Sequence, residues 1–73
     1  MSLNESVASK IRAEMARRKQ SKKTLASELG VSYAHALRLV NGDRVFTLDQ
    51  IEKVADYLKI SIMSLTHGDD HER

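Results

Sequence analysis

Cysteine and proline are both absent from this chain of 73 residues, and glycine occurs only at positions 30, 42 and 68. Without cysteine there is no disulfide framework and no thiolate metal site. Without proline, long structured segments separated by a few corners are expected. A chain this short predicts one domain over residues 1–73, with a core at about 4–66 and a flexible acidic tail at 67–73.

Long apolar runs are also missing: none approaches the roughly 18 residues of a membrane span, and the amino terminus lacks the pattern of a secretory leader. We therefore expect a cytoplasmic protein. No nucleophile–base pair, carboxylate pair or phosphate loop is visible, so we expect neither an enzyme nor a cofactor. His67 and His71 have the spacing of helical metal ligands, but Gly68 interrupts them, and a loose tail explains them better than a metal site.

Apolar residues recur at helical spacing along the chain. Val7, Ile11 and Met15 repeat at i+4 behind a capping box of Ser2 and Glu5, which predicts a helix over about 4–19. Thr47 and Gln50 form a second capping box before an apolar stripe, and Ser61 caps a short last helix; the stripe consists of Leu48, Ile51, Ala55 and Leu58. With no strand pattern, the fold class expected is an all-α bundle of five helices.

Residues 21–41 predict two short helices hinged at Gly30. Ser21 is the N-cap of the first, Ser32 is the N-cap of the second, and the second ends near Asn41. Ala26 is small where the two helices must approach, and Gly30 can adopt the left-handed conformation that a tight corner requires. This is the pattern of a DNA-binding helix-turn-helix, in which the outer side of the second helix is free to lie in a major groove.

Three motifs carry a resemblance to a known family. They are Leu25-Ala26 followed by Leu29-Gly30-Val31-Ser32, then Asn41-Gly42, then the segment from Thr47 to Ala55. With them, the chain from about Ile11 to Leu65 resembles the helix-turn-helix family of phage immunity repressors, Cro proteins and related bacterial regulators. The resemblance implies a five-helix lambda repressor-like bundle with the helix-turn-helix at its second and third helices. It also implies a transcriptional regulator that binds specific sequences of double-stranded DNA through its third helix.

The chain departs from the family's pattern at several positions. Lys22 and Tyr33 stand where relatives commonly carry glutamines that support phosphate contact and read adenine. This protein is therefore expected to read different bases. Lys19 and Gln20 replace a glycine and an aliphatic residue before the second helix, and Val45 stands where relatives often have proline.

Charge is distributed unevenly along the chain. From Lys10 to Arg44 there are nine basic and three acidic residues, whereas from Val45 to the end there are three basic and six acidic ones. Basic charge around the helix-turn-helix is the electrostatic pattern of a phosphate-binding surface. The run Arg17-Arg18-Lys19 has an alternative reading, a solvated helix end favoured by the helix dipole.

The candidate base-reading residues all belong to the third helix: Tyr33, Ala34, His35, Leu37 and Arg38. Arginine can donate two parallel hydrogen bonds to guanine, although a phosphate clamp or a surface ion pair is the alternative for Arg38. Leu37 fits a thymine methyl group or completes the core against the following loop. The ring of Tyr33 contacts DNA or covers the corner above Ala26. His35 donates to DNA or simply occupies the first helical turn.

The candidate phosphate-binding residues surround the third helix: Lys22, Lys23, Ser32, Asn41 and Arg44. Such contacts fix the register of a protein on DNA and carry no sequence information. Lys10, Arg12, Arg17 and Arg18 are weaker candidates, because one of them can pair instead with Glu14 or Glu28.

The expected partners are double-stranded DNA and a second copy of the chain. We expect no separate oligomerisation domain, and we therefore expect a homodimer to use the apolar residues Ile60, Ile62, Met63 and Leu65. The alternative is an antitoxin-like or regulatory module that mainly binds another protein and binds DNA secondarily, because a fold alone does not settle function.

Overall fold

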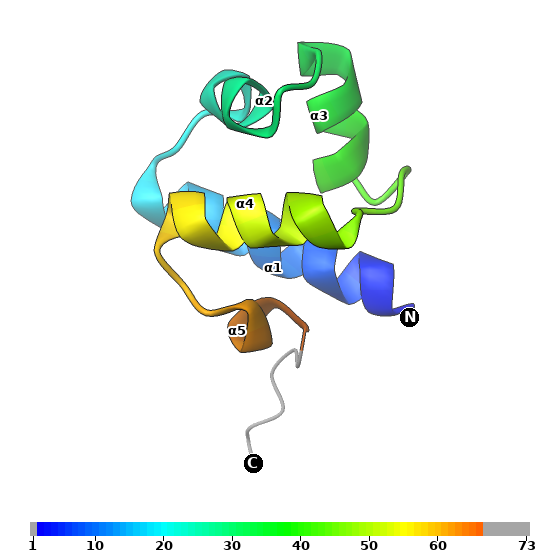
Figure 1. Cartoon of the computed structure of the whole chain (residues 1–73), viewed down its shortest axis with the longest axis vertical. Coiled ribbons are helices and arrows are strands. Elements are labelled where there is room, and N and C mark those ends of the chain that lie inside the picture. The colour runs from blue at the N-terminus through cyan, green and yellow to red at the C-terminus, as the bar shows by residue number, and fades with distance from the viewer. Residues whose placement is uncertain (1, 67–73) are drawn as a thin grey trace.

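Five helices follow one another in the computed structural model, which describes residues 2–66 (Figure 1). They are α1 (Leu3–Arg18), α2 (Lys22–Leu29), α3 (Tyr33–Val40), α4 (Leu48–Leu58) and α5 (Ile62–Thr66). The described part contains no strand, which confirms the predicted all-α bundle. None of these helices is long and apolar enough to cross a membrane. The acidic tail predicted at 67–73 lies outside the described residues.

A serine or threonine caps the start of every helix. In each case its side-chain oxygen accepts a hydrogen bond from the backbone N–H three residues later, which satisfies one of the free donors of the first turn. The five pairs are Ser2 and Glu5, Ser21 and Thr24, Ser32 and His35, Thr47 and Gln50, and Ser61 and Ser64. The first and fourth caps are complete capping boxes, as predicted.

Left-handed residues end three of the helices. Gly30 ends α2 at φ 70°, as the predicted hinge requires. α1 ends at Arg18, one residue earlier than predicted, because Lys19 adopts the left-handed conformation at φ 55°. Lys59 does the same after α4, at φ 60°. The corner after α1 thus keeps the conformation that suits glycine, although lysine occupies it.

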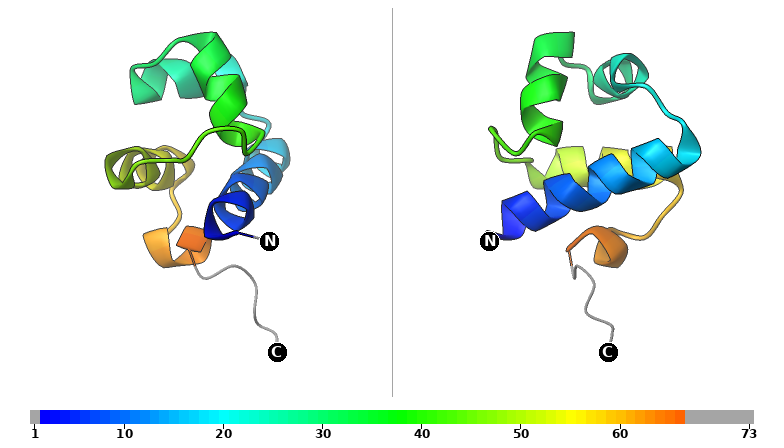
Figure 2. Two further views of the ribbon diagram at one scale, coloured as in Figure 1. Left: turned by 90° about the vertical axis from the view of Figure 1, so that its right-hand side faces the viewer. Right: turned by 180° about the vertical axis from the view of Figure 1, so that it is seen from behind.

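α1 and α4 form a middle layer, with α2 and α3 on one side of it and α5 on the other (Figures 1 and 2). α3 packs against α2 and α1, whereas α5 packs against α1 and α4. All of these helices contribute to one hydrophobic core, and its largest fully buried side chains include Ile11, Leu25, Leu39, Leu58 and Leu65. No charged or polar residue of the described part is buried.

Polar contacts between distant segments fix the helix-turn-helix on this frame. The guanidinium Nη1 of Arg12 in α1 donates to the carbonyl oxygen of Val40, the last residue of α3, over 2.6 Å. The hydroxyl of Tyr57 in α4 donates to Oε1 of Gln20, just before α2, over 2.7 Å. In addition, Asn4 in α1 bonds the connection between α3 and α4.

We predict that Gly30→Val lowers the free energy of unfolding by about 1–2 kcal/mol, because a β-branched residue resists the left-handed conformation. Apart from its neighbours in the chain, nothing lies within 4 Å of the position that a Cβ would occupy at Gly30, so the cost comes from the backbone conformation. In thermal unfolding this corresponds to a fall of about 4–8 °C for each kcal/mol. Gly30→Asn is the matched control and should lose less, because asparagine tolerates this conformation. Equal losses in both variants, or none, would contradict this account of the corner.

Lys19→Gly should change stability in the opposite direction. Glycine relieves the strain at φ 55° but adds entropy to the unfolded chain, so we expect a net gain of about 1 kcal/mol or less. Thermal and urea unfolding measure the gain. Lys19→Ala is the control, since it removes the charge and keeps the strain. A gain in the alanine variant as large as that in the glycine variant would assign the effect to charge instead.

Candidate nucleic-acid interface

α3 has a buried side and an exposed side. Ala36, Leu39 and Val40 are fully buried against the rest of the domain. The exposed side carries Arg38 together with the first residue of the helix, Tyr33, whose exposed fraction is 52%. Ala34, also exposed, adds almost no height to this surface. α3 therefore presents a polar and cationic side to the solvent.

The two remaining candidates on α3 lie at the border between these sides. His35 and Leu37 are both half-buried. The backbone N–H of His35 donates to the hydroxyl of Ser32, so this residue belongs to the capped first turn. Because Leu37 is only partly buried, part of its side chain remains within reach of a ligand on the exposed side. Both predicted roles of Leu37, contact with a thymine methyl group and completion of the core, therefore stay open.

The start of α2 lies beside the start of α3 across an open groove. Lys22 and Lys23 are the first two residues of α2, and both are exposed. The groove has a volume of about 730 Å³, and its apolar floor is flanked by cationic side chains. Its lining consists of Arg12, Met15, Ala16, Gln20, Ser21, Lys22, Lys23 and Tyr33. Three positive charges and the phenol ring of Tyr33 thus converge on one concave surface.

The other candidate phosphate contacts occupy different places. Ser32 is exposed, and its hydroxyl already caps α3. Asn41 is the C-cap of α3 and Arg44 lies in the connection to α4, and both are exposed. Candidate phosphate-binding groups therefore lie at both ends of α3 and not only at its start.

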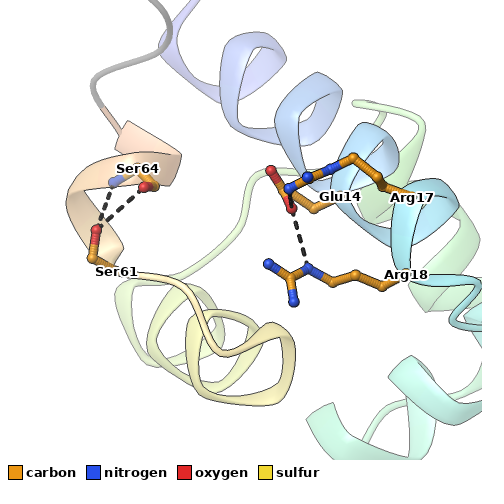
Figure 3. A network of polar contacts seen from close by, with 5 residues as sticks. All are labelled: Glu14, Arg17, Arg18, Ser61 and Ser64. Carbon is orange, nitrogen blue, oxygen red and sulfur yellow. Dashed lines mark hydrogen bonds and ion pairs between the residues drawn. The ribbon is translucent and has the colours of Figure 1, made fainter.

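Within residues 2–66, carboxylates pair with some of the cations but not with those around α3. Glu14 accepts from Arg17 at 2.6 Å and from Arg18 at 3.2 Å, and Figure 3 shows both side chains turned toward it. The hydrogen bond from Arg17, supported by Arg18, lowers the pKa of Glu14 below its usual value, although burial acts in the opposite direction. This pairing within α1 favours the solvated helix end over a DNA contact for these two arginines.

By contrast, no carboxylate of the described residues lies within ion-pair distance of Lys22, Lys23, Arg38 or Arg44. Each of these side chains is exposed. An anion that approaches the α2–α3 side therefore meets positive charge that no carboxylate of residues 2–66 pairs with.

Arg12 is the residue whose importance the sequence reasoning missed. Besides its hydrogen bond to Val40, it lines the large groove and a second one of about 200 Å³ at the end of α3, which Asn41 and Gly42 also line. In the sequence, Arg12 could be recognised as a DNA-binding candidate only by its positive charge on the first helix, and Lys10, Arg17 and Arg18 carry the same charge there. Only the fold distinguishes the arginine that faces α3 from the others.

The predicted homodimer surface, which included Leu65, requires a correction. Leu65 is fully buried in the chain's own core, so its side chain cannot form a surface between copies. Ile60 is half-buried and packs against the same core. The short α5 packs on α1 and α4 by burying Leu65. An apolar residue that packs within the chain and one that binds a second copy look the same in the sequence. Only Ile62, at 37% exposed, and Met63, at 62%, remain accessible.

Metal binding finds no support in residues 2–66, where no three His, Cys, Asp or Glu side chains are grouped closely enough to hold an ion. The pair His67 and His71 lies outside the described residues.

Comparison with known proteins supports the helix-turn-helix directly. A family model described as the Cro/C1-type HTH DNA-binding domain matches residues 10–65, a range that runs from α1 to α5. Neither the curated proteins nor the solved structures contain a significant match. The family match covers most of the chain and includes both helices of the helix-turn-helix together with the frame that holds them. The chain therefore belongs to the Cro/C1-type helix-turn-helix DNA-binding domains.

Proposed function

We propose that this protein is a sequence-specific transcriptional regulator of the phage repressor and Cro type, which reads the major groove of double-stranded DNA with α3. One observation carries the proposal: the exposed side of α3 is flanked at both ends by cations that have no carboxylate partner in the described part of the chain. A duplex supplies the missing negative charge along its two phosphate backbones.

The residues on the exposed side of α3 are assigned to the bases. The guanidinium group of Arg38 donates two hydrogen bonds to O6 and N7 of a guanine. Tyr33 and His35 contact base edges near the start of the helix. Leu37 lies against a thymine methyl group, and Ala34 allows the helix to approach the groove floor.

The residues around α3 are assigned to the phosphates. Lys22 and Lys23 contact one strand near the start of α2, where the backbone N–H groups of the first turn also favour an anion. Ser32 assists there, while Asn41 and Arg44 contact the backbone at the far end of α3. Arg12 joins the first group, since it lines the same groove as Lys22 and Lys23.

The regulator binds as a homodimer on a two-fold symmetric site, which places the two reading helices about one DNA turn, ~34 Å, apart. The second candidate function is an antitoxin-like module for a protein partner, and the exposed Ile62 and Met63 favour it. Selection of bound duplexes from a random pool separates the two. Enrichment of a two-fold motif supports the regulator, and no enrichment favours the partner module.

We predict that Arg38→Ala weakens binding to the selected duplex by about 1–3 kcal/mol and relaxes the preference at one base position of each half-site. Binding to random duplex should fall much less. Isotherms on the selected duplex and on single-base variants of it measure both effects. Arg17→Ala, which removes an arginine already paired with Glu14, is the matched control. If Arg38→Ala lowers binding to all duplexes equally, this arginine contacts phosphate.

Lys22→Ala should weaken binding to selected and random duplexes alike, because a phosphate contact carries no sequence information. Loss of one such contact reduces the slope of log K against log salt concentration by about 0.9. Titrations at several salt concentrations give this slope. Lys53→Ala is the control, since Lys53 is paired with Asp49 on α4. A loss confined to the selected duplex, with the slope unchanged, would remove Lys22 from the phosphate contacts.

A further inference from the structure

The large groove bordered by α1, the start of α2 and the start of α3 contains more than a phosphate contact requires. Phosphate accounts for Lys22 and Lys23, because charge and hydrogen bonds hold such a group. It leaves the apolar part of the lining unexplained, which Met15 and Ala16 of α1 and the ring of Tyr33 supply. We call this groove, with its lining given above, the α1–α2 groove.

The size of the α1–α2 groove suits a small organic molecule. Its volume of about 730 Å³ lies within the range of about 300–1,000 Å³ that is typical of such sites. Sites of this kind combine an apolar lining with a few polar groups that fix the orientation of the ligand. The α1–α2 groove has both, since Gln20 and Ser21 lie between its apolar part and its two lysines in the chain.

The charges of the α1–α2 groove select a negative ligand. No Asp or Glu is among the described residues that line it, and no carboxylate of residues 2–66 lies within ion-pair distance of Lys22 or Lys23. Arg12 uses Nη1 for the carbonyl oxygen of Val40. A guanidinium group has several further N–H donors, and two of them can bind a carboxylate side by side.

The apolar lining favours an aromatic ring over an aliphatic chain. Among the described residues that line the groove there is no Leu, Ile, Val or Phe. The ring of Tyr33, 52% exposed, is available for stacking on another ring. The sulfur of Met15 and the guanidinium plane of Arg12 also make favourable contacts with aromatic rings.

We propose that the α1–α2 groove binds a small aromatic carboxylate, and that this ligand displaces DNA. Its ring lies against Met15 and Tyr33, and its carboxylate lies between Arg12 and the two lysines. The same lysines are assigned to a phosphate of the duplex, so one anion excludes the other. The ligand is therefore an effector that lowers affinity for DNA. Binding of the ligand stands on the groove alone, whereas displacement rests on the proposed function.

Titration of the full chain without DNA tests the binding step. The probes are 2-naphthoate, its uncharged amide 2-naphthamide, and decanoate, which carries the charge on an aliphatic chain. Calorimetry should show 2-naphthoate binding at least about tenfold more tightly than either of the others, because each of them lacks one of the two parts that the groove recognises. Equal affinity for 2-naphthamide would overturn the role of the cations. Equal affinity for decanoate would overturn the aromatic class.

Two matched variants locate the ligand in the α1–α2 groove. Ala16 and Ala13 are both exposed residues of α1, but only the first of them lines the groove, and neither is assigned to DNA. Ala16→Trp should weaken binding of 2-naphthoate at least about tenfold, because the indole takes the space of the ligand's ring. Ala13→Trp should leave it unchanged. An equal effect in both variants, or none in either, would overturn the proposed site. Thermal unfolding shows whether each variant is folded.

The DNA arm measures displacement on a random duplex. Saturating 2-naphthoate should weaken binding and reduce the slope of log K against log salt concentration by about 2, because the phosphate contacts of both lysines are lost. Ala16→Trp should bind the duplex as the unchanged chain does, and 2-naphthoate should not affect it. If 2-naphthoate binds the unchanged chain but leaves this slope as it was, the displacement is wrong. If no duplex binds even without 2-naphthoate, the proposed function fails, while the titrations without DNA still decide the ligand site.

Discussion

The eight residues of α3 cannot form a stable helix alone in water, so this helix depends on the parts of the domain that pack behind it. Its inner side buries Ala36, Leu39 and Val40 against α2 and α1. Its start is fixed by the cap at Ser32, and its end by the hydrogen bond from Arg12 to the carbonyl of Val40. These contacts determine the direction of α3, and that direction determines which side chains face outward. The surface that we propose for DNA binding is thus a consequence of core packing.

Local rules explain why so much of the fold could be predicted from the sequence. Each helix begins at a serine or threonine that caps it, and the corner between α2 and α3 needs a conformation that suits glycine at position 30. The i+4 repeat of Val7, Ile11 and Met15 marks a buried side that the structure confirms. All of these signals act within a few residues, where the chain itself determines the geometry.

Contacts between distant segments could not be predicted in the same way. Leu65 is apolar and was expected on a free surface, yet α5 buries it completely. The sequence around Asn4 does not indicate that its side-chain amide bonds to residues about forty positions away in the chain. The basic residues show the same limit. Arg17 and Lys22 contribute equally to a charge count, but Glu14 pairs with Arg17 and not with Lys22. The charge pattern therefore predicted a basic DNA-binding surface, whereas the cations that lack a carboxylate partner within residues 2–66 became apparent only from the fold.

The connection between α3 and α4 is held from outside its own sequence. Asn4 in α1 bonds backbone groups on both sides of Val45, the carbonyl oxygen of Arg44 and the N–H of Phe46. The backbone that carries Arg44 is therefore fixed before any ligand binds. A fixed backbone lowers the entropic cost of the phosphate contact proposed for Arg44, because only the side chain remains to be ordered.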